Sequence, residues 1–210
     1  MSYPLDLIPD SRTKISNCNF QNISVESRSC FQQKARFQNV NFENMQSDDL
    51  LRISGVIFDK VVLKGKFDRL LLKSDHAGMM FNHHERGIDF ITGEECAILN
   101  AYAENEYQKI EWALDIIEAE FRECDLHPSI PANLVKINPE TQVLIKYDKI
   151  AKINWKEMST IQSNDAKYWC SLTEKNKRDS IFIAPQRNKK RFGEYMESFK
   201  ILREEGIVSS

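Results

Sequence analysis

The chain has no run of about 20 consecutive apolar residues, which is the length that a membrane-spanning helix requires. Its first residues, Met1 to Asp6, lack the basic and apolar stretches of a secretory signal peptide. Cysteine is sparse, with five residues, an odd number, and no CxxC pair. This usage is typical of reduced thiols, so we expect a cytoplasmic protein without a disulfide framework.

The motifs that mark common catalytic and cofactor sites are also missing. Glycine occurs only seven times, and GxxxxGK[ST], GxGxxG, GxSxG and HExxH are all absent. Cys124 lies close to His127, but a thiol at the expected C-terminal end of a helix would have its pKa raised. We therefore predict no catalytic residue, no metal and no cofactor, and favour a binding protein over an enzyme.

The net charge of −2 conceals an uneven distribution of charge over the 210 residues. Residues 94–125 contain ten acidic and two basic side chains, whereas residues 126–210 contain fifteen basic and ten acidic ones. Such a division favours a partner of complementary charge, although a solvated acidic helix would have the same composition.

A five-residue spacing recurs between Cys18 and Leu72. Each unit has a small or apolar residue, a polar residue and a bulky apolar one, as in Ala35-Arg-Phe37 and Val40-Asn-Phe42. Neither a helix nor an ordinary strand repeats every five residues. The phase slips at residues 30–35 and again at 44–51. Further units are Cys18-Asn-Phe20, Ile23-Ser-Val25, Leu51-Arg-Ile53, Val56-Ile-Phe58 and Val61-Val-Leu63.

These units resemble those of pentapeptide-repeat proteins, in which a small residue, Asp or Asn, and Leu or Phe precede two variable residues. The resemblance covers only the N-terminal region. It implies a right-handed, four-sided β-helix in which bulky residues stack inward and each coil is buried against its neighbours. The same residues also fit the period-2 alternation of an antiparallel sheet, which is the alternative architecture.

We expect an α+β fold with two modules, a pentapeptide-like β module at residues 1–75 and an α+β module at 76–210. In the second, Thr92 and Glu95 fit a capping box that would start a long acidic helix over about residues 93–123. The apolar stripe of this helix has spacings of four, three and four residues. It comprises Ile110, Leu114, Ile117 and Phe121.

The C-terminal part of the chain has a mixed α and β pattern. Residues 134–137 and 143–147 predict a hairpin, and Ile181 to Ala184 predict a buried strand. Ser163 could cap a short helix, and a final helix is expected over about residues 188–205, with Gly206 as its stop.

Two groups of charged residues are candidate binding sites. The first is a carboxylate row on the expected acidic helix, suited to a basic partner: Glu104, Glu111, Asp115 and Glu118. The second is a basic run of candidate phosphate contacts: Arg187, Lys189, Lys190 and Arg191. A pI of about 6.1 argues against a dedicated nucleic-acid binder. His76, His83 and His84 lie in an expected linker and read as surface residues.

We interpret the chain as a non-enzymatic protein-binding or inhibitory protein. One such role is an immunity-type protein that neutralises a basic toxin, such as a nuclease, through the acidic helix face. The alternatives are a metal-dependent enzyme or nucleic-acid-processing protein with a site between the modules, and a scaffold component whose repeat offers a strand edge. No membrane partner is expected, and the sequence leaves the oligomeric state open.

Overall fold

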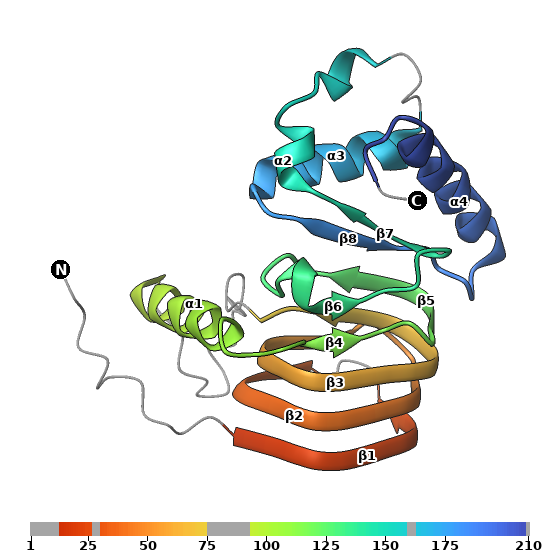
Figure 1. Cartoon of the computed structure of the whole chain (residues 1–210). Coiled ribbons are helices and arrows are strands. Elements are labelled where there is room, and N and C mark those ends of the chain that lie inside the picture. Colours follow the sequence, from red (N-terminus) through yellow and green to blue (C-terminus); the bar gives the residue numbers. More distant parts are fainter. Residues whose placement is uncertain (1–12, 27–29, 75–92, 159–162, 209–210) are drawn as a thin grey trace.

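The computed structural model describes residues 13–26, 30–74, 93–158 and 163–208. Within these ranges the fold is mixed α/β. It has a six-stranded sheet with only parallel strand pairs, a two-stranded antiparallel sheet and four α-helices (Figure 1). None of the described helices has both the length and the hydropathy needed to cross a membrane.

Along the chain, one helix lies between the third and fourth strands of the larger sheet. The larger sheet contains β1 (Thr13–Val25), β2 (Cys30–Ser47), β3 (Leu51–Leu72), β4 (Leu114–Asp115), β5 (Ala119–Leu126) and β6 (Val135–Lys136). The smaller sheet contains β7 (Gln142–Ile145) and β8 (Ser180–Ile183). The helices are α1 (Gly93–Tyr107), α2 (Tyr147–Ile150), α3 (Asn164–Asn176) and α4 (Lys189–Glu204), with 3₁₀ turns at Ala132–Leu134 and Trp155–Glu157.

The three longest strands, β1, β2 and β3, form a stack of curved ribbons that run in the same direction (Figure 1). Phe20 pairs with Phe42, and Phe42 in turn pairs with Leu63. The alternative expectation of an antiparallel sheet is therefore wrong. A register shift between Gln32 and Ala35 falls within the first phase slip of the sequence.

Left-handed backbone conformations explain the five-residue spacing. Asn17 and Asn22 have φ of 55° and 52°, and Asn39 and Asn44, their counterparts in β2, have φ of 53° and 55°. Asparagine adopts this conformation more readily than most residues. The side-chain amides of Asn39 and Asn44 each donate to the amide oxygen of the counterpart in β1 at 3.2 Å. Each bend is thus held by a bond between neighbouring strands.

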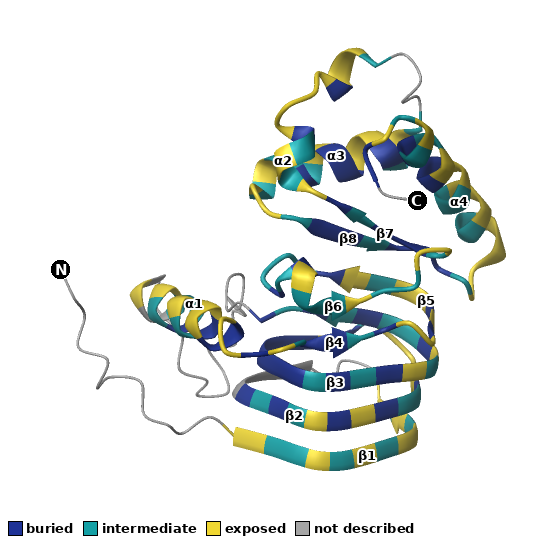
Figure 2. Cartoon of the chain, in the orientation of Figure 1, coloured by how far each residue is buried: buried dark blue, intermediate teal, exposed yellow. Residues whose placement is uncertain are grey.

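Between the bends of β2, buried residues alternate with more exposed ones (Figure 2). Ala35, Val40, Val56 and Val61 have no exposed surface, as expected for small residues where neighbouring backbones approach closely. The bulky positions stack in the same interior. The rings of Phe20 and Phe42 are nearly parallel, with centroids 5.1 Å apart. The apolar pair in each repeat therefore supplies the core.

The larger sheet continues beyond residue 75, where the sequence suggested a module boundary. β4 and β5 pair with β3, and β6 pairs with β4. The predicted long acidic helix is wrong beyond Tyr107, because residues 114–126 form strands instead. The stripe with helical spacing has a second interpretation, since Leu114, Ala119 and Cys124 are also five residues apart. Each is followed two positions later by another apolar residue: Ile116, Phe121 and Leu126.

Helix α1 covers one side of the stack through charged and polar contacts. Arg36 of β2 forms ion pairs with Asp59 of β3 at 2.6 Å and with Glu106 of α1 at 2.8 Å. The backbone N–H of Phe58 donates to the Tyr107 hydroxyl at 3.2 Å. These partners are largely buried, so the helix is fixed to the stack rather than lying loosely beside it.

The two-stranded sheet closes one end of the stack. Ile181 and Ile183, on one face of β8, join the core of the stack, whereas Val143 and Ile145 of β7 join a second core with α2, α3 and α4. In that second core the rings of Trp169 and Phe199 lie 5.2 Å apart. The small sheet thus separates two hydrophobic cores.

The predicted hairpin between residues 134–137 and 143–147 is wrong, because its two segments pair with other strands. β6 pairs with β4, and β7 pairs with β8. Helix α3 has Ser163 as its N-cap, whose side chain accepts from the N–H of Ala166. Helix α4 begins and ends within one residue of the expected range, and Gly206 follows it with φ of 67°. Thr92 of the expected capping box lies outside the described residues.

Gly65 and Gly193 provide a matched test of the bends. Gly65 has φ of 77°, and a Cβ there would collide with the amide oxygen of Asn44. We expect Gly65→Ala to lower the free energy of unfolding by about 1–3 kcal/mol. Gly193 lies in α4 with open space around it, so Gly193→Ala should raise that free energy by about 0.5–1 kcal/mol. Urea unfolding measures both changes in the free energy of unfolding. Equal changes in the two variants would contradict a left-handed bend at Gly65.

The anchor of α1 predicts a pH-dependent loss of stability in Glu106→Gln. Desolvation raises the pKa of Glu106, but Lys109 and Arg36 together outweigh it and hold that pKa below 4.5. A carboxylate with a lowered pKa adds stability above its unfolded pKa, and this is lost as pH falls through the folded pKa. Glu106→Gln should cost about 2 kcal/mol at pH 7. In urea titrations the difference from the native chain should shrink as the pH falls through the lowered folded-state pKa of Glu106, and a constant difference would rule out the charge effect.

Candidate functional site on one side of the stack

One side of the stack presents aligned side chains from five strands. We call it the front face, and it is the side on which the labels of β1, β2, β3, β4 and β6 lie in Figure 1. Its strand segments lie between two columns of bends. The first row across it follows the pairing register. That row comprises Asn19, Asn41, Val62, Asp115 and Lys136.

A second row crosses the front face nearer the next column of bends. Gln21, Glu43 and Lys64 are aligned there. The side-chain amide of Gln21 donates to the Glu43 carboxylate at 3.1 Å. Phe42 and Leu63, which lie between the two rows along their strands, are buried. Surface and core residues therefore alternate along these strands.

Three of the four predicted carboxylates border the upper part of the front face. Glu111 is 3.0 Å from Lys60, and Glu118 is 2.9 Å from Lys64, at the two bends that flank this side. Asp115, between them, is 3.6 Å from Lys136. The carboxylates lie on a sheet and its borders rather than on a helix, and each faces a cation of the same chain.

The ion pairs at the borders stay accessible to solvent. The side chains of Glu111 and Glu118 are 75% and 65% exposed, whereas Asp115 is only 24% exposed. The hydrogen bond to Glu111 raises the pKa of Lys60, and the hydrogen bond to Glu118 raises that of Lys64. Both lysines are therefore charged at neutral pH, and the exposed border carboxylates can accept further hydrogen bonds.

Apolar side chains lie among these charges. Ile117 is 43% exposed, and the Lys136 ammonium is 3.8 Å from the ring centroid of Trp112. Tryptophan among charged groups is a frequent centre of binding energy in protein interfaces. Trp112, Ile117 and Lys136 were not among the site residues predicted from the sequence. The five-residue spacing over 114–126 is the signal that would have placed Ile117 close to Asp115.

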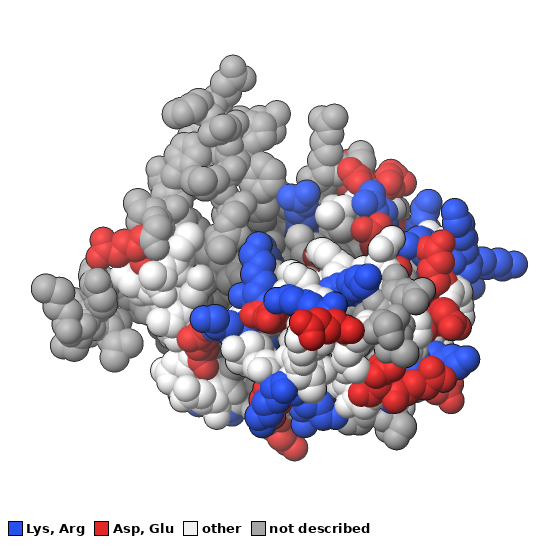
Figure 3. Space-filling model, turned by 90° about the horizontal axis from the view of Figure 1, so that it is seen from above, with Lys and Arg blue, Asp and Glu red and all other residues white. Residues whose placement is uncertain are grey.

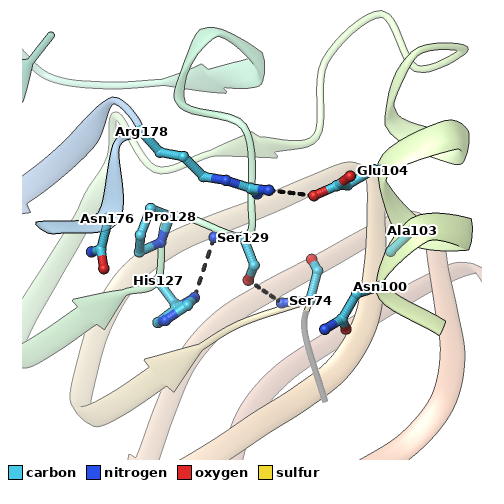
Figure 4. Close-up of a pocket in the computed structure, with 9 residues that line it drawn as sticks. All are labelled: Ser74, Asn100, Ala103, Glu104, His127, Pro128, Ser129, Asn176 and Arg178. Carbon is cyan, nitrogen blue, oxygen red and sulfur yellow. Dashed lines mark hydrogen bonds and ion pairs between the residues drawn. The ribbon is translucent and has the colours of Figure 1, made fainter. Parts of the chain in front are cut away.

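Glu104 lies apart from the front face, at a pocket of about 220 Å³ (Figure 4). It comes from α1 and forms an ion pair with Arg178, which follows α3. On the opposite wall the Ser129 hydroxyl accepts from the backbone N–H of Ser74 at 2.9 Å, and the Ser129 N–H donates to Nδ1 of His127 at 3.2 Å. These bonds tie the end of β3 to the segment after β5, which is a structural role.

Two of the cysteine thiols, those of Cys124 and Cys170, are poorly suited to nucleophilic chemistry. Burial raises the pKa of Cys124 far above its ordinary value, and the carboxylates of Asp125 and Glu123 raise it further. Burial likewise raises the pKa of Cys170 to about 12. Both thiols are protonated at neutral pH, so Cys124 beside His127 does not supply a thiolate.

The predicted phosphate contacts are divided by the fold. Arg187 donates to the carbonyl of Phe67 and to Asp68, both at 2.9 Å, and Arg191 pairs with Asp165 and Glu194. Lys189 and Lys190 are exposed at the start of α4. Figure 3 shows basic and acidic side chains interspersed on this end of the molecule rather than gathered by sign. The two arginines thus join α4 to its neighbours.

His76, His83 and His84, which we expected to be surface residues of a linker, lie outside the described residues. Among the described residues, no group of three or more His, Cys, Asp or Glu side chains is arranged to hold a metal ion. Comparison of the chain with protein-family models, curated proteins and solved structures gave no match.

The border ion pairs should contribute far less to stability than the anchor of α1. Lys64→Ala removes a cation from an exposed pair, and we expect its melting temperature to change by less than about 2 °C. Arg36→Ala leaves the largely buried Asp59 without its cation and Glu106 with Lys109 alone, so a fall of about 6–15 °C is expected. Differential scanning calorimetry compares them, and similar shifts in both variants would contradict this contrast.

Proposed function

We propose that this chain is a non-enzymatic protein-binding protein that docks its partner on the front face. The observation that carries the proposal is the alignment of Asp115 with Glu111 and Glu118 at its borders and Trp112 and Ile117 beside it. The partner is expected to present basic side chains. Neutralisation of a basic toxin, such as a nuclease, is the role that we infer for this binding.

The scaffold we propose is a short pentapeptide-repeat β-helix. Parallel pairing of consecutive strands supports it, as do left-handed bends five residues apart at Asn17 and Asn22, Asn39 and Asn44, and Lys60 and Gly65. Such a scaffold is rigid because each bend is tied to the next strand. A preformed surface loses little conformational entropy when a partner binds.

The charge pattern narrows the kind of partner. Lys60, Lys64 and Lys136 offset most of the negative charge, so long-range attraction to any basic protein is weak. An arginine can instead form two parallel hydrogen bonds with a carboxylate, which a lysine cannot. A partner with arginines placed opposite Glu111 and Glu118 could therefore replace the exposed lysines. This makes recognition depend on geometry more than on net charge.

The test is a capture experiment with immobilised protein and an extract of the source cells. The triple variant Glu111→Lys, Asp115→Lys, Glu118→Lys should lose a partner that the native chain retains, by at least about tenfold, because like charges then oppose the arginines. Its matched control is Glu140→Lys, Glu157→Lys, Glu197→Lys, which changes three exposed carboxylates away from this face and alters net charge equally.

Both variants are first checked for native unfolding curves. Retention of the partner by the first triple variant would exclude the front face as its docking surface. Equal loss in both variants would show that net charge, rather than the front face, governs binding. Glu104→Lys should bind as the native chain does, because Glu104 lies at the pocket beside Arg178.

A further inference from the structure

The two ends of the strand stack differ in what covers them. At one end Ile181 and Ile183 of β8 complete the hydrophobic core. At the other end β1 is the last strand, and in the described part of the chain it pairs only with β2. A parallel strand leaves half of its backbone donors and acceptors directed away from its neighbour. The free edge of β1 is therefore a ready template for another strand.

The inward side chains of β1 are less buried than their counterparts one strand further in. Ile15, Cys18, Phe20 and Ile23 are half-buried, and β1 is drawn without the buried colour in Figure 2. Their register partners are 0–8% exposed. Those partners are Phe37, Val40, Phe42 and Met45. One ring face of Phe20 stacks on Phe42, so the core ends in partly exposed apolar surface.

The free edge also lacks the usual protection against strand pairing. Lys14 is the only charged residue among the thirteen of β1, and the strand contains no proline. In contrast, β3 carries seven charged residues among its 22. Edge strands commonly avoid association through charges, proline or short length, and β1 has little of these.

The sequence of β1 is arranged symmetrically about Asn19. A two-fold axis at Asn19 places residue n opposite residue 38 − n of the second copy, so Thr13 meets Val25. Inward residues then meet inward residues, with Ile15 opposite Ile23 and Cys18 opposite Phe20. The two-residue corners 16–17 and 21–22 coincide, although the left-handed residues themselves are offset by one, with Asn17 opposite Gln21 and Asn22 opposite Ser16. No lysine faces another lysine in this register.

We propose that two copies of this chain associate through antiparallel pairing of their β1 strands about Asn19. The contact is isologous, since the same strand serves both copies, and it covers both open cores at once. It goes beyond the proposed partner binding and does not require it. The two front faces then form one continuous surface, with the Asp115 sites roughly 34 Å apart at seven strand spacings. A dimeric or repetitive partner would bind such a pair with increased avidity.

The first test is sedimentation velocity of the purified full chain over about 1 to 100 µM, a range suited to an interface of modest size. A dimer is expected, and a monomer throughout would overturn the proposal. Asn19→Lys should weaken the dimer by at least about tenfold, because two ammonium groups meet at the axis. Gln21→Lys is the control, since residue 21 is opposite position 17.

The register is tested by disulfide trapping in the same chain. Residues directly opposite in an antiparallel pair have Cβ atoms about 5 Å apart, which permits a disulfide. Asn19→Cys should therefore give a reducible dimer under mild oxidation. Two cysteines at position 21 would be about 13 Å apart along the strands, so Gln21→Cys should cross-link no more than the native chain. Cross-linking of both variants, or of neither, would overturn the proposed register.

Both positions suit these substitutions because Asn19 and Gln21 are exposed and lie on the same strand. Unchanged urea unfolding midpoints at a concentration where the chain is monomeric would show that each variant folds. A dimer that forms while the front-face triple variant fails to lose its partner would refute the proposed function alone. A monomer that still binds its partner through the front face would refute only this association.

Discussion

The structure depends on one backbone constraint, a left-handed bend at about every fifth residue that is tied to the bend of the next strand. Asn39 and Asn44 adopt this conformation and donate to Asn17 and Asn22. Because the bends coincide from strand to strand, residues about 22 positions apart lie side by side, and their backbones pair in parallel. Every surface of the stack is therefore assembled from segments that are remote in sequence, including the front face.

A stack of this kind has sides and ends, and the other elements of the chain cover only some of them. Helix α1 covers one side through Arg36 and its two carboxylate partners, and β7 and β8 cover one end with Ile181 and Ile183. The front face and, among the described residues, the outer edge of β1 are the surfaces on which we propose that other molecules bind. The first presents charges that are already paired, and the second presents half-buried apolar side chains. These two surfaces suit different partners, one recognised by geometry and charge and the other by strand pairing.

The charged residues illustrate how location changes the role of a similar pair. Arg36 lies between largely buried carboxylates and fixes a helix, whereas Lys64 and Glu118 form a pair in solvent. Arg187 and Arg191 belong to a basic run in the sequence, yet both are used inside the fold, with Asp68 and Asp165. The basic run in the sequence therefore does not form a basic patch from its two arginines, because each arginine pairs with an acidic residue of another element.

The local signals of the sequence were sufficient wherever the interaction is local. Ser163 caps α3, α4 occupies its expected range, and the apolar pairs of residues 18–63 point into a core, since capping and side-chain alternation act within a few residues. Residues 114–126 fit both a helical stripe and a five-residue spacing, and only the edge of β3 decided between them by pairing with Ala119 to Leu126. The strands at 135–136 and 142–145 were recognisable, but their partners were not. Strand partners depend on backbone hydrogen bonds between distant segments, so the tertiary structure alone determined the front face and, in the described part of the chain, left β1 paired only with β2.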